Sequence, residues 1–163
     1  MYQTDLGFIA EEAKRRADDY AAFRYYAELD ERSDAELDAL VESIAAPIVN
    51  AIDCTQCANC CRSLDVYVTP SDAQRLSTII PLDDIIDYER AHADDEWGML
   101  RDKPCRFLDG KLCSVYPHRP DSCRLYPVFT PDFRWTTEEV LGGVGLCPII
   151  YNVIEELQRV LGW

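Results

Sequence analysis

Four of the eight cysteines lie within eight residues, in the run Cys54-Thr-Gln-Cys57-Ala-Asn-Cys60-Cys61. A C-x-x-C-x-x-C run lets one short turn present three sulfurs to a metal centre, whereas a disulfide framework spreads its cysteines so that each bridge closes a loop. We therefore name all eight thiols as candidate metal ligands, which would fill two four-sulfur sites or one four-sulfur site with spare thiols. The other four cysteines are more widely spaced and are expected to close these sites: Cys105, Cys113, Cys123 and Cys147.

The spacing of the cysteines favours an iron–sulfur cluster, of the 4Fe–4S type, over zinc. Such clusters are commonly held by a C-x-x-C-x-x-C run and a remote cysteine before a proline, and Cys147-Pro148 resembles this remote member. Zinc sites more often pair two C-x-x-C knuckles, but Cys105, Cys113 and Cys123 are not spaced as knuckles. Because soft thiolates suit either metal, zinc stays the alternative.

Arginines and glycines accompany the later cysteines. Arg106, Arg119 and Arg124 lie near them in sequence. These cations either lower cysteine pKa values and offset the charge of a thiolate-rich site, or form ordinary salt bridges in an acidic protein. The Gly142-Gly-Val-Gly145 turn is flexible enough for its backbone amides to point at sulfur.

No catalytic constellation is recognisable in the sequence, so we name no catalytic residue and expect a protein that is not an enzyme by itself. Catalysis at the metal would need an open coordination position and acid–base groups nearby. The nominees for that role are Asp53, Asp65, His118 and Tyr126. Neither His118 nor the other histidine, His92, has metal-ligand spacing.

The composition indicates an acidic protein with an ordinary core. The chain has 163 residues and is 48% hydrophobic, which suits one domain with a helical extension and means that metal need not supply all the stability. A net charge of −14 argues against a nucleic-acid binder, because phosphate contacts need clustered cations. The charge fits either a solvated acidic surface or docking on a partner protein with a basic surface.

No stretch approaches the ~20 apolar residues of a membrane span. Residues 1–10 lack the basic and apolar regions of a secretory signal. We therefore expect a cytoplasmic location, where thiols stay reduced and serve as metal ligands or redox groups.

Before the cysteine run, the hydrophobic pattern predicts a helical hairpin over residues 1–52. One amphipathic helix is expected over 5–30. A second begins after a capping box formed by Ser33 and Glu36, and Pro47 should kink it.

After the cysteine run, the pattern predicts short elements. Residues 64–68 alternate like a strand. Thr69-Pro70 should cap a helix that ends near residue 80, and Pro81 should start another through Tyr88. Residues 91–103 resemble a loop.

The last third combines a hairpin with a helix. Asp109-Gly110, between two apolar runs, predicts a hairpin that places Cys105 and Cys113 on neighbouring arms. A helical turn is expected around Cys123, a strand over 133–135, and a helix from Pro148. The predicted fold class is mainly α with small β pieces (α+β), divided into the hairpin (1–52) and a cysteine-rich metal-binding domain with a C-terminal helix (53–163).

Three segments together resemble a known family. They are Cys54-x-x-Cys57-x-x-Cys60-Cys61, the stretch 104–116, and Arg119-Pro120-x-x-Cys123-Arg-x-Tyr126-Pro127. Their order and spacing are similar to the CxxCxxCC cysteine-cluster family, also called the YkgJ-type zinc- or iron-chelating domain, over residues 54–148.

The resemblance implies metal chelation. Together with the residues it supports an iron–sulfur protein that acts as a redox or oxygen-responsive subunit, or as an accessory protein. The alternatives are a structural zinc protein that mediates protein–protein interaction, and a metal-dependent enzyme distantly related to flagellin lysine-N-methylase. That enzyme is larger than this chain, which shows no S-adenosylmethionine-binding loop.

Overall fold

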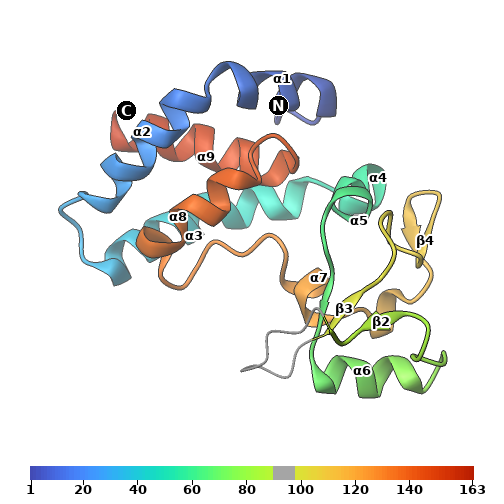
Figure 1. The fold of residues 1–163 in the computed structure, drawn as a ribbon. Coiled ribbons are helices and arrows are strands. Elements are labelled where there is room, and N and C mark those ends of the chain that lie inside the picture. The colour runs from blue at the N-terminus through green and yellow to red at the C-terminus, as the bar shows by residue number, and fades with distance from the viewer. Residues whose placement is uncertain (90–97) are drawn as a thin grey trace. The chain divides into compact units, whose positions relative to one another are not determined.

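The computed structural model describes residues 1–89 and 98–163, and shows a mainly helical chain with two small antiparallel sheets (Figure 1). Two compact units are present. Unit 1 combines residues 1–53 with 127–163, and unit 2 comprises residues 54–126. The predicted fold class is confirmed. The C-terminal helix, which the sequence analysis placed with the cysteine-rich domain, belongs to unit 1.

Unit 1 is built from five helices in the described part of the chain. They are α1 (Leu6–Arg15), α2 (Ala17–Glu28), α3 (Asp34–Ala51), α8 (Phe133–Gly142) and α9 (Pro148–Leu161). Helix α3 packs against α8 and α9, and α2 packs against α8 (Figure 1). The core of this unit therefore joins two stretches that are far apart in the sequence.

The single helix expected over residues 5–30 is instead two helices that meet at Arg16. The Arg16 guanidinium binds Asp19 on α2 and Glu155 on α9, each at 2.6 Å. The break is therefore accompanied by tertiary ion pairing, and the sequence around it contains neither glycine nor proline. The predicted capping box is confirmed: the Glu36 amide donates to the Ser33 hydroxyl at 3.3 Å, and α3 continues through Pro47.

The predicted strand over 133–135 is wrong, because these residues begin helix α8. The Asp38 carboxylate, on α3, accepts hydrogen bonds from the amides of Asp132 and Phe133, both at 2.9 Å. Those amides are orphan donors at a helix start, and a side chain from a distant helix satisfies them. The buried Arg134 side chain then binds Asp34 at 2.6 Å and four backbone carbonyls between residues 27 and 32.

Unit 2 consists of short elements around a small core. In chain order they are α4 (Cys54–Cys57), α5 (Asn59–Ser63), β1 (Tyr67–Val68), α6 (Pro70–Ser77), β2 (Ile86–Asp87), β3 (Gly98–Leu100), β4 (Leu108–Asp109), β5 (Leu112–Cys113), the 3-10 helix η1 (Tyr116–His118) and α7 (Asp121–Leu125). The core residues are Val66, Val68, Leu76, Ile85, Ile86, Leu100 and Phe107.

The three-stranded sheet has the order β1-β3-β2, with Tyr67 opposite Met99 and Ile86 opposite Leu100. The Thr69 cap and the helix after it are confirmed, although α6 ends at Ser77. Two predictions are wrong here. The helix expected from Pro81 is replaced by a turn and β2, and the loop expected over 91–103 contains the buried strand β3. Residues 91–97 of that loop, with His92, lie outside the described residues.

The predicted hairpin is confirmed, with the turn one residue further along than Asp109-Gly110. Asp109 pairs with Leu112, so the two loop residues are Gly110 and Lys111. Gly110 has a φ of 59°, which a type II′ turn requires at its first loop position. The hairpin places Cys113 opposite Leu108.

Candidate metal centre

The C-x-x-C-x-x-C-C run folds as two short helical turns rather than one. Helix α4 ends where the Ala58 amide donates to the Cys54 carbonyl at 3.0 Å, and Ala58 then adopts a left-handed φ of 53° before α5 begins. This reversal brings Cys60 and Cys61 onto the second turn, with their sulfurs 4.0 Å apart. Two sulfurs on one tetrahedral metal ion, with bonds of about 2.3 Å, would be about 3.8 Å apart.

Three of the later cysteines face one core. Cys105, Cys113 and Cys123 are each half-buried and pack against the hydrophobic cluster of unit 2. The Cys105 amide also donates to the Cys61 carbonyl at 2.8 Å, which joins the hairpin to the cysteine run. The thiols of Cys57, Cys61, Cys105, Cys113 and Cys123 are free.

Arg62 holds the same two segments together. Its guanidinium donates to the Cys57 carbonyl at 2.9 Å and to the Gly110 carbonyl in the hairpin turn at 3.1 Å. Sequence analysis missed Arg62, although its place directly after Cys61 was an available signal.

The thiols differ in pKa because their local surroundings differ. A hydrogen bond with Cys60 lowers the pKa of Cys61 to about 6, and the positive charges of Arg62 and Arg119 act in the same direction. Burial raises the pKa of Cys105 and that of Cys113, and it raises the pKa of Cys123 to about 12. A neutral thiol is therefore favoured at the three core-facing positions until a cation arrives.

Backbone amides partly oppose the rise in thiol pKa that burial causes. The amide of Phe107 hydrogen bonds to Cys105, and the amide of Val115 hydrogen bonds to Cys113; both contacts lower the thiol pKa. Each amide comes from the residue two positions after its cysteine. Such contacts orient a thiolate ligand and stabilise its charge.

A buried carboxylate positions the segment that carries Cys123. Asp72, fully buried on α6, accepts a hydrogen bond from the Asp121 amide at the start of α7 at 3.1 Å. Arg75 binds Asp72 and also contacts Asp121 at 3.0 Å. The Thr69-Pro-Ser-Asp72 capping box was readable in the sequence, but its link to α7 was not.

The arginines and glycines that accompany the later cysteines in sequence have different surroundings in the structure. Arg119 acts on the pKa of Cys61 and Cys113, while Arg106 and Arg124 form ion pairs with Asp102 and Asp121. Gly145 lies against α1, where an added Cβ would stand 2.8 Å from the Ala13 side chain. Its role is close helix packing within unit 1.

The catalytic nominees are spread over both units. Asp65 pairs with Lys103 at 2.7 Å, and His118 ends η1. Asp53 is the last residue of the first stretch of unit 1, and Tyr126 is the last residue of unit 2.

The donor set fits a soft metal, because it consists of thiols supported by amides and guanidinium groups. Across residues 1–89 and 98–163, no three Cys, His, Asp or Glu side chains already stand together as a metal-binding group. Seven cysteines belong to unit 2, and the buried Cys147 belongs to unit 1, where it precedes α9. The assignment of all eight cysteines as ligands stays a prediction.

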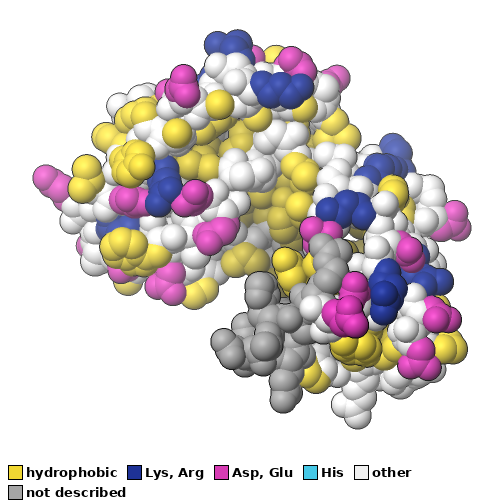
Figure 2. Space-filling model, viewed as in Figure 1, with side chains coloured by type: hydrophobic (Ala, Val, Ile, Leu, Met, Phe, Trp, Pro, Cys, Tyr) yellow, Lys and Arg dark blue, Asp and Glu magenta, His cyan; other side chains and the backbone are white. Residues whose placement is uncertain are grey.

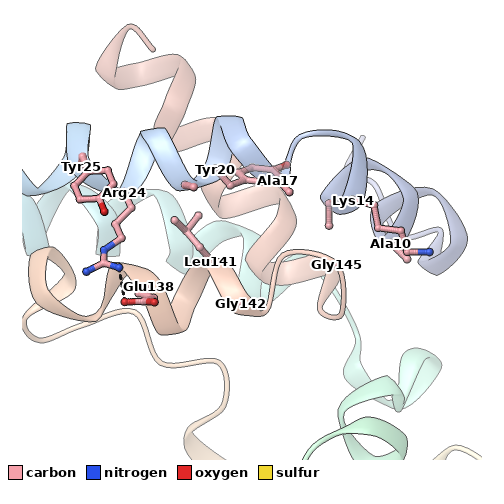
Figure 3. A pocket seen from close by; sticks show the side chains of 12 residues that line it. Ala10, Lys14, Ala17, Tyr20, Arg24, Tyr25, Glu138, Leu141, Gly142 and Gly145 are labelled. Carbon is pink, nitrogen blue, oxygen red and sulfur yellow. Dashed lines mark hydrogen bonds and ion pairs between the residues drawn. The ribbon is translucent and has the colours of Figure 1, made fainter.

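Unit 1 contains a groove of about 530 Å³ between α1, α2 and α8 (Figure 3). Alanines and glycines form much of its wall, and Arg24 spans one end to bind Glu138. No cysteine lines this groove, so its chemistry differs from that of the thiol cluster.

None of the described helices is both long and apolar enough to cross a bilayer. A family model, CxxCxxCC, described as "Putative zinc- or iron-chelating domain", matches residues 53–140. No curated protein and no solved structure matches the chain.

Proposed function

Because the chain belongs to the CxxCxxCC family of zinc- or iron-chelating domains, we propose that its thiols hold an iron–sulfur cluster of the 4Fe–4S type. The spacing of Cys54, Cys57 and Cys60 supports iron, since three sulfurs separated by two residues suit one face of such a cluster. At Cys61, a hydrogen bond with Cys60 and the positive charges of nearby arginines favour the thiolate form that a metal ligand requires.

One observation carries the proposal: the cysteine run and three of the four later cysteines, Cys105, Cys113 and Cys123, lie within a single unit. The Cys61 carbonyl accepts the Cys105 amide, and Arg62 bonds to both the run and the hairpin turn. Thiols far apart in sequence are thus held around one core, which is the arrangement that chelation needs.

We further propose a redox, oxygen-responsive or accessory role, with a partner protein that has a basic surface. Unit 1 contains 18 acidic and 7 basic residues, and unit 2 contains 12 and 9, so the net charge is −11 on unit 1 and −3 on unit 2. Unit 1 is therefore the part that would meet a basic partner, in a complex that weakens as salt concentration rises.

The test is anaerobic purification of the full chain, followed by measurement of iron, acid-labile sulfide and zinc per chain. We expect iron and sulfide in equal amounts and a broad visible absorption that bleaches on reduction. Cys57→Ser should lose the absorption, whereas the exposed Ser43→Ala in unit 1 should retain it. A colourless protein with zinc and no iron would overturn the iron–sulfur proposal.

A structural zinc protein is the second candidate, favoured by the short elements of unit 2. Apart from the eight-residue α6, its described helices and strands have five residues or fewer. Small units with little regular structure are commonly stabilised by a bound metal. Under this alternative the isolated protein contains zinc, and chelation lowers the helical signal without any change in a redox-active band.

A further inference from the structure

We propose that the groove between α1, α2 and α8 is a docking site for an amphipathic, basic helix of a partner protein. The inference rests on the proposed function only for the basic character of that partner, and it names the surface of unit 1 that receives it. All the residues that line the groove belong to unit 1.

One wall of the groove is an apolar face of α1 and α2 that lies outside the core. Ala13, Ala17 and Ala21 line the groove at a spacing of four residues, and Tyr25 continues the series. Ala17 and Ala21 are exposed, and Tyr25 is 60% exposed, whereas Phe23 on α2 is fully buried in the core. Helix α2 therefore has a second apolar face that a docked partner would cover.

The groove is closed at one end and open beside Gly142. An added Cβ at Gly142 would meet nothing within 4 Å, whereas one at Gly145 would stand 2.8 Å from the Ala13 side chain. Residues 10–25, which supply the α1–α2 wall, extend for roughly 20 Å, or roughly four turns of helix. Small side chains along a wall of this length let the backbone of a docked helix approach closely.

The charged side chains of the lining already have partners within unit 1. Lys14 binds Glu11 at 2.9 Å, and Arg24 binds Glu28 at 2.8 Å and reaches across to Glu138 (Figure 3). These two cations and three carboxylates have a net charge of −1, in a unit whose net charge is −11. The groove therefore combines apolar walls with a surplus of negative charge, to which a basic partner is complementary.

These properties favour a helix over two other occupants. A small polar ligand is held by convergent hydrogen-bonding groups, but Lys14, Arg24 and Glu138 are already engaged in ion pairs. A second copy of this chain would bring together two units with a net charge of −11 each, which opposes association. An amphipathic helix fills the groove with apolar side chains and directs basic side chains at its flanking carboxylates.

The probe is a synthetic peptide of about 18 leucine and lysine residues, with leucine at the i, i+3, i+4 and i+7 positions of a helix. The labelled peptide is titrated with the full chain, and fluorescence anisotropy measures the affinity. We expect binding that weakens several-fold as sodium chloride rises from ~50 to ~500 mM. A peptide with the same leucine pattern and glutamate in place of lysine should bind at least ~10-fold more weakly.

Neighbouring residues on α2 give a matched test of the site. Ala21 lines the groove, whereas Ala22 is exposed and is not among the lining residues. Ala21→Gln should weaken binding at least ~10-fold, because the longer polar side chain occupies the groove. Ala22→Gln should leave the affinity unchanged. Glutamine is a good helix former, and circular dichroism checks that both variants are folded.

A second matched pair on α8 tests the contribution of charge. Glu138 lines the groove, whereas Glu139 is exposed and is not among the lining residues. Glu138→Gln should weaken binding of the lysine peptide ~3-fold, because it removes an acidic group from the groove and leaves Arg24 with one carboxylate fewer. Glu139→Gln should have a smaller effect.

Three results would overturn the proposal: equal affinities of Ala21→Gln and Ala22→Gln, equal binding of the lysine and glutamate peptides, or no measurable binding of the lysine peptide. Sedimentation of the free chain as a dimer that Ala21→Gln dissociates would also overturn it, because the occupant would then be a second copy.

Failure of this inference is distinguishable from failure of the proposed function, since iron and sulfide are measured in the same preparations. Salt-sensitive binding of the lysine peptide that Ala21→Gln leaves intact supports a basic partner and contradicts docking in the groove. Binding in the groove by a chain that contains no iron supports this inference and contradicts the iron–sulfur proposal.

Discussion

Unit 1 and unit 2 reach a folded structure by different means. The five helices of unit 1 have 10 to 18 residues and bury large side chains such as Phe23, Phe133 and Leu157. Unit 2 has strands of two or three residues around a smaller core, and half-buried thiols pack against that core. Burial of apolar side chains is the main stabilising contribution in unit 1. The smaller core of unit 2 contributes less stability, and binding of a metal ion can supply more.

The two units also differ in charge. Acidic and basic side chains are both present over the surface in Figure 2, but the excess of acidic residues falls mostly in unit 1. In unit 2, arginines contact the cysteine-bearing segments directly. The comparison indicates that one unit carries most of the excess acidic charge and the other carries most of the cysteines, and five predictions test it.

Metal removal should have the largest effect, and it should be confined to unit 2. Hydrogen–deuterium exchange before and after chelation should show amides of residues 54–126 exchanging at least ~100-fold faster, because metal-binding free energy contributes to folding free energy. Amides of residues 1–53 and 127–163 should change little. Equal acceleration in both units would show that the distinction between them is wrong.

Arg134→Ala should destabilise unit 1 by about 3 kcal/mol, because it leaves Asp34 and four backbone carbonyls without their buried partner. Chemical denaturation followed by circular dichroism measures this change. The control is Arg159→Ala, whose ion pair with Glu156 is exposed, so that its loss should change stability little. Metal content should be unchanged in both variants.

Gly145→Ala should cost unit 1 about 1–3 kcal/mol, because the new methyl group would stand 2.8 Å from the Ala13 side chain. Gly142→Ala is the matched control, since an added Cβ there meets nothing within 4 Å. Its thermal midpoint should stay the same or rise. Similar losses in the two variants would argue against close packing at Gly145.

Ala58→Val should destabilise the metal-free unit 2 by about 1–2 kcal/mol, since a β-branched residue is strained at the left-handed φ of 53°. Ala58→Gly removes that strain together with a buried methyl group, so its net effect should be under about 1 kcal/mol. Exchange rates of amides in residues 54–63 report both changes. A tolerated valine would mean that the turn between α4 and α5 is not constrained.

The smallest effect should be a pH dependence of the metal-free protein. The pKa of Cys61 is lowered from 9.0 to about 6, so the folded state gains stability as pH rises through this range and loses it as pH falls through about 6. Burial raises the pKa of Cys123 to about 12, so that thiol opposes folding only above pH 9. Alkylation rates at pH 7 should therefore be faster for Cys61 than for Cys123.

Arg62→Gln tests the cause of this pH dependence, because it removes one of the two cations near Cys61. The midpoint of Cys61 alkylation should move to higher pH, while that of Cys123 should stay where it was. Since Cys60 and Cys61 share a hydrogen bond, the measured midpoint belongs to the pair.

Much of the fold could be predicted because it depends on interactions between residues that are close together in the sequence. The Ser33 and Thr69 caps, the glycine hairpin and the start of α9 at Pro148 all depend on neighbours within a few residues. The errors arose where a distant residue decides the outcome. Asp38 caps α8, and Glu155 binds Arg16 at the break between α1 and α2.

The amino-acid sequence alone shows a candidate site rich in thiols, with eight cysteines, half of them in one run, and an excess of acidic residues elsewhere. The folded chain shows in addition which thiols share a unit, that Cys147 belongs with the helices, and that Arg62 joins the run to the hairpin. The difference arises from the distance along the chain over which each kind of interaction acts. Spacing constrains side chains within a turn or two, whereas residues far apart in the chain meet only through the packing of a core.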